Sequence, residues 1–411
     1  MRLSKPRSAW DRLVLTQDAN LRTSNQWLFS KYDALNRPVL TGLYTDATHN
    51  TQGSMQSCLT SQGLGRYENR NTGVQLGYTT TLSFPSLSSM TYSTTDWLTI
   101  SFYDDYSGGN LFGASYYTRD NSKDGSFAAA SNTTYPYPQP VTESSATRGQ
   151  PTISIARIIG SSNNVYRVSF YDSRGRVVQV KTFTGTEATD AASSQYSFDG
   201  KPLETADYHQ KIGTNAQNHT VITKLAYDAG GRLLTVYKNV DNAGTDQLIS
   251  TNTYNELGQL QNKALGNNLD NLTYDYHIRG WLKSINKSYV DGTATNNYFG
   301  MDLGYEKATA GNPATQVGQY NGNISSQVWR SSGDGIARKY DYKYDNANRI
   351  TRAEYTQNSS GSTWDANTLD FSVYGFDPDN GYGIKYDANG NILMMIQKGW
   401  KAGQTAIIDA L

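Results

Sequence analysis

The chain has 411 residues, a length that allows two or three domains, and its 36 basic residues balance its 36 acidic ones. This balance argues against a basic nucleic-acid-binding face, and no basic amphipathic stretch favours a membrane surface. No run of about 18 apolar residues is present, so we expect no transmembrane span. Residues 1–6 lead into no apolar segment of the kind a signal peptide needs, so we expect either a cytoplasmic protein or an internal piece of a longer one.

Cys58 is the only cysteine, so we expect neither a disulfide within the chain nor a cysteine-based zinc site. The chain has 31 tyrosines and 37 glycines. With glycine counted in place of tyrosine, apolar residues make up roughly 38% of the chain, against about 45–50% in typical globular domains. This composition suits a thin curved sheet with one half-wet face, where tyrosine rings pack and tyrosine hydroxyls reach water or a partner.

Taken in order, the first expected elements are two strands at 27–32 and 38–41. Residues 46–75 are polar and glycine-rich, without a clear period. Strand composition returns at 78–84 and 97–103.

Residues 120–151 are expected to be a linker or long loop, in which Pro136, Pro138 and Pro140 favour a stiff, extended spacer. Beyond it the expected hairpins are dense, and helical signals are scarce. The predicted division is an N-terminal β region at 1–119, the linker at 120–151, and a repeat region at 152–411.

One short motif recurs: Tyr, Asp, two variable residues, Gly, Arg, then an apolar run. A recurring unit predicts a repeat architecture. Its six copies begin at Tyr32-Asp33 (followed by Asn36-Arg37), Tyr171-Asp172 (Gly175-Arg176), Tyr227-Asp228 (Gly231-Arg232), Tyr254-Asn255 (Gly258-Gln259), Tyr344-Asp345 (Asn348-Arg349) and Tyr386-Asp387 (Gly390-Asn391).

In each copy Asp or Asn stands three residues before Gly or Asn. This is typical of a type I turn followed by a left-handed residue, a common way to close a bulged β-hairpin. Gly takes that conformation without steric cost, and Asn is the next best residue. The flanking runs at 165–170 and 177–183 are β-branched and aromatic, so the unit is predicted to be strand, turn, strand.

A seventh copy departs from this spacing. From Tyr274-Asp275 it places Gly280, followed by Trp281, five residues after the Asp, so we expect a longer or differently bulged loop there. Degenerate copies are expected at Tyr305-Glu306 and at Tyr320-Asn321-Gly322-Asn323.

These units resemble the YD repeats of the rearrangement hot spot (Rhs) family. The stretches 10–18, 31–39, 278–282 and 319–324 are similar to Rhs-type proteins of Bacteroidetes, and the likeness is weakest at 46–75 and 120–150. The resemblance implies an all-β fold in which antiparallel β-hairpins spiral into a curved, partly open shell. In this family, which includes polymorphic toxins, such a shell encloses a variable C-terminal segment that is often a toxin.

The resemblance further implies a secreted or cell-surface protein. Its partner would be the core and toxin region downstream in the same polypeptide, or a neighbouring chain. The sequence contains neither the self-cleaving core segment nor a toxin domain, so we expect a partial shell. Residues 377–381 are similar to the core's Asp-Pro-x-Gly cleavage motif, but Gly381 lies one place late and a turn is expected instead.

Catalytic and metal-binding patterns are missing from the sequence. No two of His49, His209, His219 and His277 have metal-ligand spacing, and neither a nucleophile elbow nor a phosphate-binding loop is present. We therefore expect no catalytic residue, no cofactor and no metal. Five tryptophans could stack on sugars, although packing is the commoner role: Trp97, Trp281, Trp329, Trp364 and Trp400.

Three functions remain open at this point. The favoured one is a structural container without chemistry of its own. The second is a surface module that binds glycans or a neighbouring cell, which requires outward clusters of aromatic residues. The third is a carbohydrate-active enzyme, which requires two carboxylates converging in a cleft.

Overall fold

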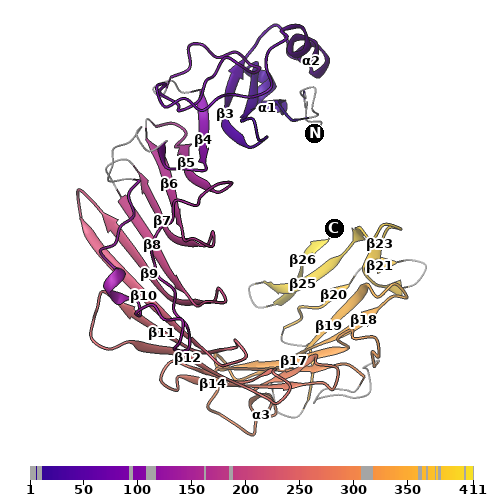
Figure 1. Cartoon of the computed structure of the whole chain (residues 1–411). Helices are drawn as coiled ribbons and strands as arrows, with labels where there is room; N and C mark the ends of the chain where they lie inside the picture. Colours follow the sequence, from indigo (N-terminus) through magenta and orange to yellow (C-terminus); the bar gives the residue numbers. More distant parts are fainter. Residues whose placement is uncertain are drawn as a thin grey trace. The chain divides into compact units, whose positions relative to one another are not determined.

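The computed structural model describes residues 6, 12–91, 96–107, 117–161, 163–184, 188–306, 318–359, 363–366, 369–374, 376–377, 381–401 and 404–410. The chain divides into two compact units, and Figure 1 labels their strands and helices. Unit 1 comprises Met1–Ala226 and Lys238–Asp246, and unit 2 comprises Tyr227–Tyr237 and Gln247–Leu411. The regular elements of the described residues are nearly all antiparallel β-strands, which confirms the predicted all-β class.

Unit 1 contains an antiparallel meander in which each strand pairs with the next one along the chain. Its strands are β1 (Leu15–Thr16), β2 (Gln26–Tyr32), β3 (Pro38–Thr45), β4 (Trp97–Tyr103), β5 (Pro151–Arg157), β6 (Asn164–Tyr171), β7 (Val177–Thr184), β8 (Ala188–Tyr196), β9 (Pro202–Lys211) and β10 (Gln217–Tyr227).

Unit 2 also contains an antiparallel meander. The strand β11 (Leu233–Val240) is divided between the two units. The meander of unit 2 consists of β12 (Gln247–Tyr254), β13 (Leu260–Leu265), β14 (Asp270–Tyr276), β15 (Leu282–Ile285), β16 (Phe299–Gly304), β17 (Ser326–Ser331), β18 (Ala337–Tyr344), β19 (Ile350–Asn358), β20 (Val373–Tyr374), β25 (Ile396–Lys401) and β26 (Gln404–Ala410).

Two small hairpins of unit 2 stand outside this meander. One joins β21 (Phe376–Asp377) to β22 (Gly381–Tyr382), and the other joins β23 (Lys385–Tyr386) to β24 (Ile392–Met394). Asp377 pairs with Gly381 in the first. Residues 378–380 of the expected turn between them lie outside the described residues.

The predicted strand at 78–84 is wrong. Ser83 and Tyr78 form only isolated bridges. The reason is local: the backbone N–H groups of Leu82 and Ser83 donate to the Glu68 carboxylate, at 3.2 and 2.9 Å, so they are not available to a strand ladder.

The stretch at 46–75, for which the sequence predicted no regular element, contains a helix. Within the described residues the α-helices are α1 (Ala19–Thr23), α2 (Gln52–Ser61) and α3 (Lys287–Val290). The side chain of Thr51 accepts from the Ser54 N–H, and the Ser54 side chain accepts from the Thr51 N–H. This reciprocal capping box begins α2, and it was the signal that could have revealed the helix.

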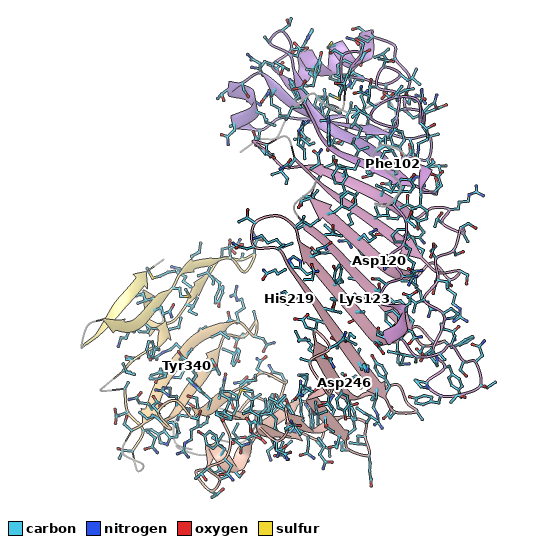
Figure 2. All side chains as sticks on the ribbon, turned by 90° about the vertical axis from the view of Figure 1, so that its left-hand side faces the viewer. Phe102, Asp120, Lys123, His219, Asp246 and Tyr340 are labelled. Carbon is cyan, nitrogen blue, oxygen red and sulfur yellow. The ribbon has the colours of Figure 1, made fainter. Side chains whose placement is uncertain are left out.

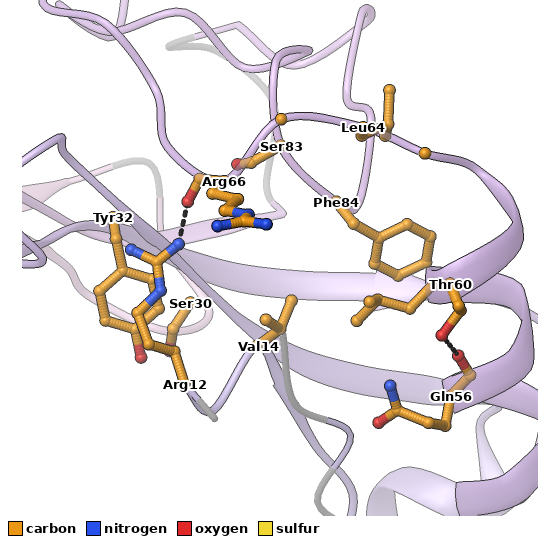
Figure 3. Close-up of a pocket in the computed structure, with 13 residues that line it drawn as sticks. Arg12, Val14, Ser30, Tyr32, Gln56, Thr60, Leu64, Arg66, Ser83 and Phe84 are labelled. Carbon is orange, nitrogen blue, oxygen red and sulfur yellow. Dashed lines mark hydrogen bonds between the residues drawn. The ribbon is translucent and has the colours of Figure 1, made fainter. Parts of the chain in front are cut away.

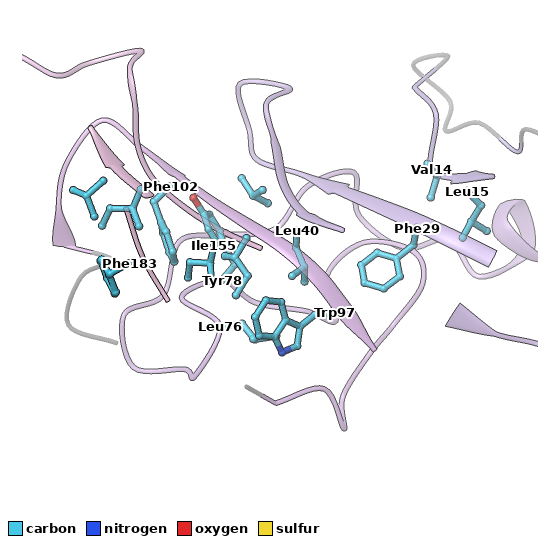
Figure 4. Close-up of a cluster of buried hydrophobic side chains, with 14 of the residues drawn as sticks. Val14, Leu15, Phe29, Leu40, Leu76, Tyr78, Trp97, Phe102, Ile155 and Phe183 are labelled. Carbon is cyan, nitrogen blue, oxygen red and sulfur yellow. The ribbon is translucent and has the colours of Figure 1, made fainter. Parts of the chain in front are cut away.

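The core of unit 1 lies on one face of its first strands (Figure 4). Phe29, Leu40, Trp97 and Phe102 are buried there, and Tyr78 from the irregular segment packs against them. Stacking of the Tyr78 and Phe102 rings, with centroids 5.4 Å apart, fixes this contact.

The stretch predicted as a linker is a long loop held on the sheet of unit 1, with one turn of 3-10 helix at Asp124–Ser126. The buried amide of Gln179 accepts from the Asp120 N–H at 2.7 Å and donates to the Asp120 carbonyl at 2.6 Å. Gln195 does the same with Ala128, at 3.1 and 2.7 Å. Lys123 Nζ lies 4.8 Å from the centroid of the Tyr208 ring on β9. Figure 2 labels Asp120 and Lys123 beside the strands of unit 1.

The loop therefore acts as a strap across β7 and β8. Its proline stretch is not the expected spacer, because Pro138 bridges to Ser197 and the Gln139 N–H donates to the Tyr196 carbonyl at 2.8 Å. Both predicted boundaries, at 119 and 151, lie inside unit 1. The predicted division of the chain stays a prediction.

A buried ion pair gives the first testable prediction. Lys31 Nζ lies 2.7 Å from Glu68 Oε1, and neither side chain is exposed. Burial lowers the pKa of Lys31, and the Glu68 charge opposes that shift. We expect Glu68→Gln to lower the free energy of unfolding by about 3–5 kcal/mol, because it leaves the Lys31 charge buried without its counter-charge.

Urea denaturation of the whole chain, followed by circular dichroism, measures this loss. The double variant Lys31→Met with Glu68→Gln is the control, since it removes the charge and keeps the amide oxygen as acceptor for the Ser83 N–H. It should be more stable than Glu68→Gln alone. Equal stability of the two variants would contradict the prediction.

Candidate functional site

The recurring motif forms a row of tight turns along one edge of the sheet in each unit. The residue at the fifth position has a positive φ in all six copies: Asn36 (65°), Gly175 (76°), Gly231 (78°), Gly258 (78°), Asn348 (62°) and Gly390 (87°). In the copy at Tyr171, the Gly175 N–H donates to the Asp172 carbonyl at 3.0 Å, and the Asp172 N–H donates to the Arg176 carbonyl at 2.9 Å. These bonds close the hairpin as the turn pattern predicts.

The side chain of the turn aspartate is hydrogen-bonded within its own loop. Asp172 Oδ1 accepts from the N–H groups of Arg174 and Arg176, at 2.8 and 2.9 Å, and Asp172 Oδ2 accepts from Arg176 Nε at 2.7 Å. Burial alone would raise the pKa of Asp172, but these bonds outweigh it and lower the pKa. The carboxylates of Asp33, Asp228 and Asp345 bind the N–H and Nε of their own arginines in the same way.

Two copies reach the same geometry without an ion pair. Asn255 Nδ2 donates to Gln259 Oε1 at 2.8 Å, and Asn391 Nδ2 donates to Asp387 Oδ2 at 2.7 Å. A side-chain hydrogen bond across the turn is therefore the shared requirement, and charge is optional.

In five of the six motif copies the tyrosine hydroxyl reaches back to the preceding hairpin. Within the described residues, nine contacts of this kind join a tyrosine hydroxyl to a backbone carbonyl at 2.7–3.0 Å: Tyr32 to Leu13, Tyr103 to Pro38, Tyr171 to Pro151, Tyr196 to Val177, Tyr254 to Leu233, Tyr276 to Leu260, Tyr305 to Leu282, Tyr344 to Ile324 and Tyr386 to Ile350. Six of these carbonyl acceptors belong to the residue that directly follows the last residue (Arg, Gln or Trp) of a six-residue motif copy. We call this set of contacts the tyrosine relay.

The acceptor carbonyls lie where the backbone ladder stops. Between β7 and β8, for example, the last ladder pair at this edge is Gln179 with Ser193, and Val177 lies two residues beyond it. The same two-residue offset occurs in seven of the nine relay contacts. The hydroxyl thus takes the carbonyl that the ladder leaves unpaired, which would otherwise cost free energy.

The arginine completes the relay by lying over the tyrosine ring of the next turn. The guanidinium carbon is 4.4 Å from the ring centroid for Arg37 on Tyr103, 5.0 Å for Arg176 on Tyr196, 4.7 Å for Arg232 on Tyr254 and 4.6 Å for Arg349 on Tyr386. Arg176 also donates to the Ser197 carbonyl at 2.8 Å, and Arg349 to the Asp387 carbonyl at 3.0 Å. Each arginine therefore ties its own turn to the next one.

The expected longer loop after Tyr274-Asp275 is wrong. The turn begins two residues later: the Gly280 N–H donates to the His277 carbonyl at 2.8 Å, and the His277 N–H donates to the Trp281 carbonyl at 2.7 Å. Tyr276 is the relay tyrosine, while Tyr274 and Asp275 belong to β14. Asp275 accepts from the Ser284 hydroxyl at 2.7 Å, so it binds a neighbouring strand and not a turn.

In this copy aromatic stacking replaces the ion pair. His277 stands at the Asp position and stacks on Trp281, with ring centroids 5.4 Å apart. Trp281 stands at the Arg position and lies 5.2 Å from the ring of Tyr305, the next relay tyrosine. Another copy was missed at Tyr196-Ser197-Phe198-Asp199-Gly200-Lys201, where Gly200 has a φ of 93°. Serine in place of aspartate hid it.

The remaining candidate residues are engaged within the fold. Trp97 is fully buried, and Trp329 stacks on Tyr340 at 5.5 Å. Lys339 lies over the ring of Trp364 at 5.6 Å, and the side chain of Trp400 lies outside the described residues. His209 pairs with Asp190, His219 with Asp241 and His277 with Glu306.

A pocket of about 440 Å³ opens in unit 1 (Figure 3). Arg12, Arg66 and Tyr32 form one wall, and Leu64 and Phe84 form another. Arg12 contacts the first motif turn: its guanidinium carbon lies 4.9 Å from the Tyr32 ring centroid, and its Nη1 donates to Asn36 Oδ1 at 2.7 Å. Its Nη2 donates to the Arg66 carbonyl. None of the described lining residues is a carboxylate, histidine or cysteine, so these side chains provide no acid–base pair.

No family model and no curated protein matches the chain. Among solved structures it is similar to TcdB2-TccC3 without its hypervariable C-terminal region, at 12% identity and a TM-score of 0.38, over 97% of this chain and 17% of that one. It is also similar to the Photorhabdus luminescens Tc holotoxin pore with a TccC3 mutation, at 12% identity and a TM-score of 0.22, over 95% and 22% of the two chains.

A porin-like protein from Bacteroides uniformis matches at 10% identity and a TM-score of 0.19, over 60% of this chain and 94% of that one. The chain spans less than a quarter of the length of each of the two toxin chains. None of the helices in the described residues has the length and apolar character needed to cross a membrane.

The tyrosine relay predicts a cost for removing a single hydroxyl. Tyr171 is 4% exposed, and its hydroxyl donates to the Pro151 carbonyl at 2.7 Å. We expect Tyr171→Phe to lower the free energy of unfolding by about 0.5–1.5 kcal/mol, measured by urea denaturation. Tyr320→Phe is the control, because Tyr320 is 75% exposed, and it should change stability little. Equal effects would contradict the relay.

The arginine–aspartate contacts predict a dependence of stability on pH. The two Nη atoms of Arg37 donate to the Asp104 carboxylate at 2.9 and 2.7 Å, which lowers its pKa to about 2 from 3.8. Because the folded pKa is below the unfolded one, this stabilisation is fully present above about pH 4 and is lost as the pH falls towards 2.

In Arg37→Gln the pKa of Asp104 should rise, so the difference in urea midpoint from the wild type should shrink as the pH falls through that window. The same substitution in an Asp104→Asn background should show a much weaker dependence on pH. If the difference in urea midpoint between Arg37→Gln and the wild type did not change with pH, the Arg37–Asp104 contact would make no pH-dependent contribution to stability.

Proposed function

We propose that the chain is a structural YD-repeat wall, a shell segment of an Rhs-type protein that encloses or presents a C-terminal effector in the full-length protein. One observation carries the proposal. The recurring aspartate, asparagine and arginine side chains bind their own turn or the neighbouring one, and in five of the six copies the tyrosine hydroxyl binds the preceding hairpin, so the motif joins hairpins edge to edge.

The relay also tolerates inserted chain. The donor and acceptor of a relay contact lie 19 residues apart for Tyr196 and Val177, 36 apart for Tyr386 and Ile350, and 65 apart for Tyr103 and Pro38. The contact keeps the same chemistry in all three. A wall built this way extends by adding hairpins and accepts insertions between them, which suits a container better than a site with fixed chemistry.

The two alternatives have weaker support. Glycan binding needs outward aromatic platforms, whereas Trp27 and Trp97 are fully buried and Trp329 is stacked within unit 2. An enzyme needs converging carboxylates, whereas the turn aspartates are bound by arginine and by backbone N–H groups. We therefore propose that this chain is not an enzyme.

By its family resemblance, we propose that the protein acts outside the cell or on its surface, as a Bacteroidetes polymorphic-toxin component. Its partner would be a core and toxin region of the same polypeptide or a neighbouring chain. We propose no nucleic-acid partner, in keeping with the balanced charge.

Small-angle scattering of the chain tests the wall directly. A compact domain of this length has a radius of gyration of about 22 Å. A single-layer wall places its mass away from its centre, so we expect a clearly larger value from a monodisperse sample. A radius near 22 Å would contradict the proposal.

Enclosure is tested on the complete gene product that carries this chain. The segment following the wall should resist protease under native conditions and be cleaved rapidly when expressed alone. Equal cleavage rates would contradict enclosure. Retention of the purified chain on a glycan panel, or hydrolysis of chromogenic glycosides, would favour the alternatives.

A further inference from the structure

Three potential metal ligands of different types meet in unit 1, away from the tyrosine relay. They are a carboxylate oxygen of Asp46, a ring nitrogen of His49 and Sγ of Cys58, and the three atoms lie within 4.8 Å of one another. Asp46 follows β3, His49 lies in the next turn, and Cys58 comes from α2. The only cysteine of the chain and one of its four histidines therefore share one spot.

The local fold holds two of these ligands in place. Asp46 Oδ1 accepts from the N–H groups of Thr48 and His49, at 2.8 and 2.9 Å, while Asp46 Oδ2 lies 2.9 Å from His49 Nδ1. The Asp46 N–H donates to the Asn25 carbonyl at 2.9 Å. Only 11% of the Asp46 side chain is exposed, so the carboxylate has little freedom to turn away.

Cys58, in α2, supplies the third potential ligand atom. It is partly buried against the unit 1 core, as is Tyr44, and its Sγ accepts a weak hydrogen bond from Gln62 at 3.7 Å. The Tyr44 hydroxyl lies 3.5 Å from Asp46 Oδ2, where it can support the carboxylate as an outer partner. The sulfur thus faces the Asp46–His49 pair and not open solvent alone.

We propose that Asp46, His49 and Cys58 form a zinc-binding site. A mixed sulfur, nitrogen and oxygen set suits Zn²⁺, whereas Mg²⁺ and Ca²⁺ take oxygen ligands. Tetrahedral coordination at usual zinc bond lengths separates ligand atoms by about 3.3–3.8 Å, so shifts of roughly an ångström complete the site. The fourth position is left to water.

The charges balance in this arrangement. Zinc displaces the Cys58 thiol proton to solvent and binds the thiolate, the Asp46 carboxylate and the neutral His49 ring. The charges of +2, −1 and −1 sum to zero, so a partly buried site carries no net charge. Bound zinc would fasten α2 to the turn after β3, and it would stabilise the folded chain in proportion to its free concentration.

The chain supplies its own control. His209–Asp190 and His219–Asp241 in unit 1 are also histidine–aspartate pairs, but the chain's single cysteine lies at neither. If a histidine–aspartate pair alone took zinc, these pairs would compete. The inference is specific to the pair that faces Cys58.

Untagged chain, stripped with chelator and titrated with Zn²⁺ by calorimetry, tests the site. We expect one equivalent of zinc and a rise in the unfolding temperature. Cys58→Ser and His49→Gln should each weaken binding at least about tenfold, and His219→Gln should leave it unchanged. Mg²⁺ should not compete.

Substitution with Co²⁺ gives a second readout, because thiolate coordination produces a sulfur-to-cobalt charge-transfer band that Cys58→Ser should abolish. Far-UV circular dichroism of each metal-free variant shows whether it folds, and His49→Gln leaves the core-facing cysteine in place. The inference is overturned if the wild type takes up no zinc, or if Cys58→Ser and His49→Gln bind it as tightly as the wild type.

Discussion

The hydrogen bond from a tyrosine hydroxyl to a backbone carbonyl of the preceding hairpin is the contact on which the repeat depends. An antiparallel ladder normally pairs every second carbonyl with a neighbouring strand, but a bulged turn shifts the register at its base. The structure has such shifts beside the motif tyrosine, as at Phe170/Tyr171 and Gln195/Tyr196. The next strand ends its ladder before this bulge, and the hydroxyl takes over where the ladder stops. One side chain therefore satisfies the acceptor and sets the offset between hairpins.

This constraint explains why the other motif positions are what they are. The tyrosine ring must lie flat along the edge to deliver its hydroxyl, and the guanidinium of the preceding turn covers it. That guanidinium is aimed by the turn aspartate, whose second oxygen binds Nε. The aspartate is itself fixed by two N–H groups of its own loop, and those point inward only if the fifth residue takes a positive φ. Each element of the motif thus serves the placement of one hydroxyl, and Trp281 can replace arginine because stacking on Tyr305 supplies the same cover.

The local half of this logic could be predicted from sequence, and the non-local half could not. Asp or Asn three places before Gly or Asn specifies the turn by backbone energetics alone, so the six turns with that pattern could be found, whereas the turn with Ser197 at the Asp position could not. The partner of each relay tyrosine is 16 to 65 residues away, with no fixed spacing to reveal it.

Without that partner, Tyr274 and Tyr276 look equivalent, and only the bond from Tyr276 to the Leu260 carbonyl decides the register. The strand expected at 78–84 failed for a similar reason. Glu68 lies ten or more residues away, and its carboxylate captures the N–H groups that a strand would need.

The variable chain length between the donor and acceptor of a relay contact indicates where inserted segments can be accommodated. Because the relay contacts form whatever the length of chain between donor and acceptor, long segments between hairpins leave the sheet undisturbed. The two longest such segments in unit 1 lie between β3 and β4 and between β4 and β5. The first contains α2 and the Asp46–His49–Cys58 cluster, and the second contains the strap that Gln179 and Gln195 hold across the sheet. In both cases the inserted chain is fastened to the sheet by its own polar contacts. A repeat whose edge is joined by side chains can therefore keep its architecture constant while inserted segments between its hairpins acquire new chemistry.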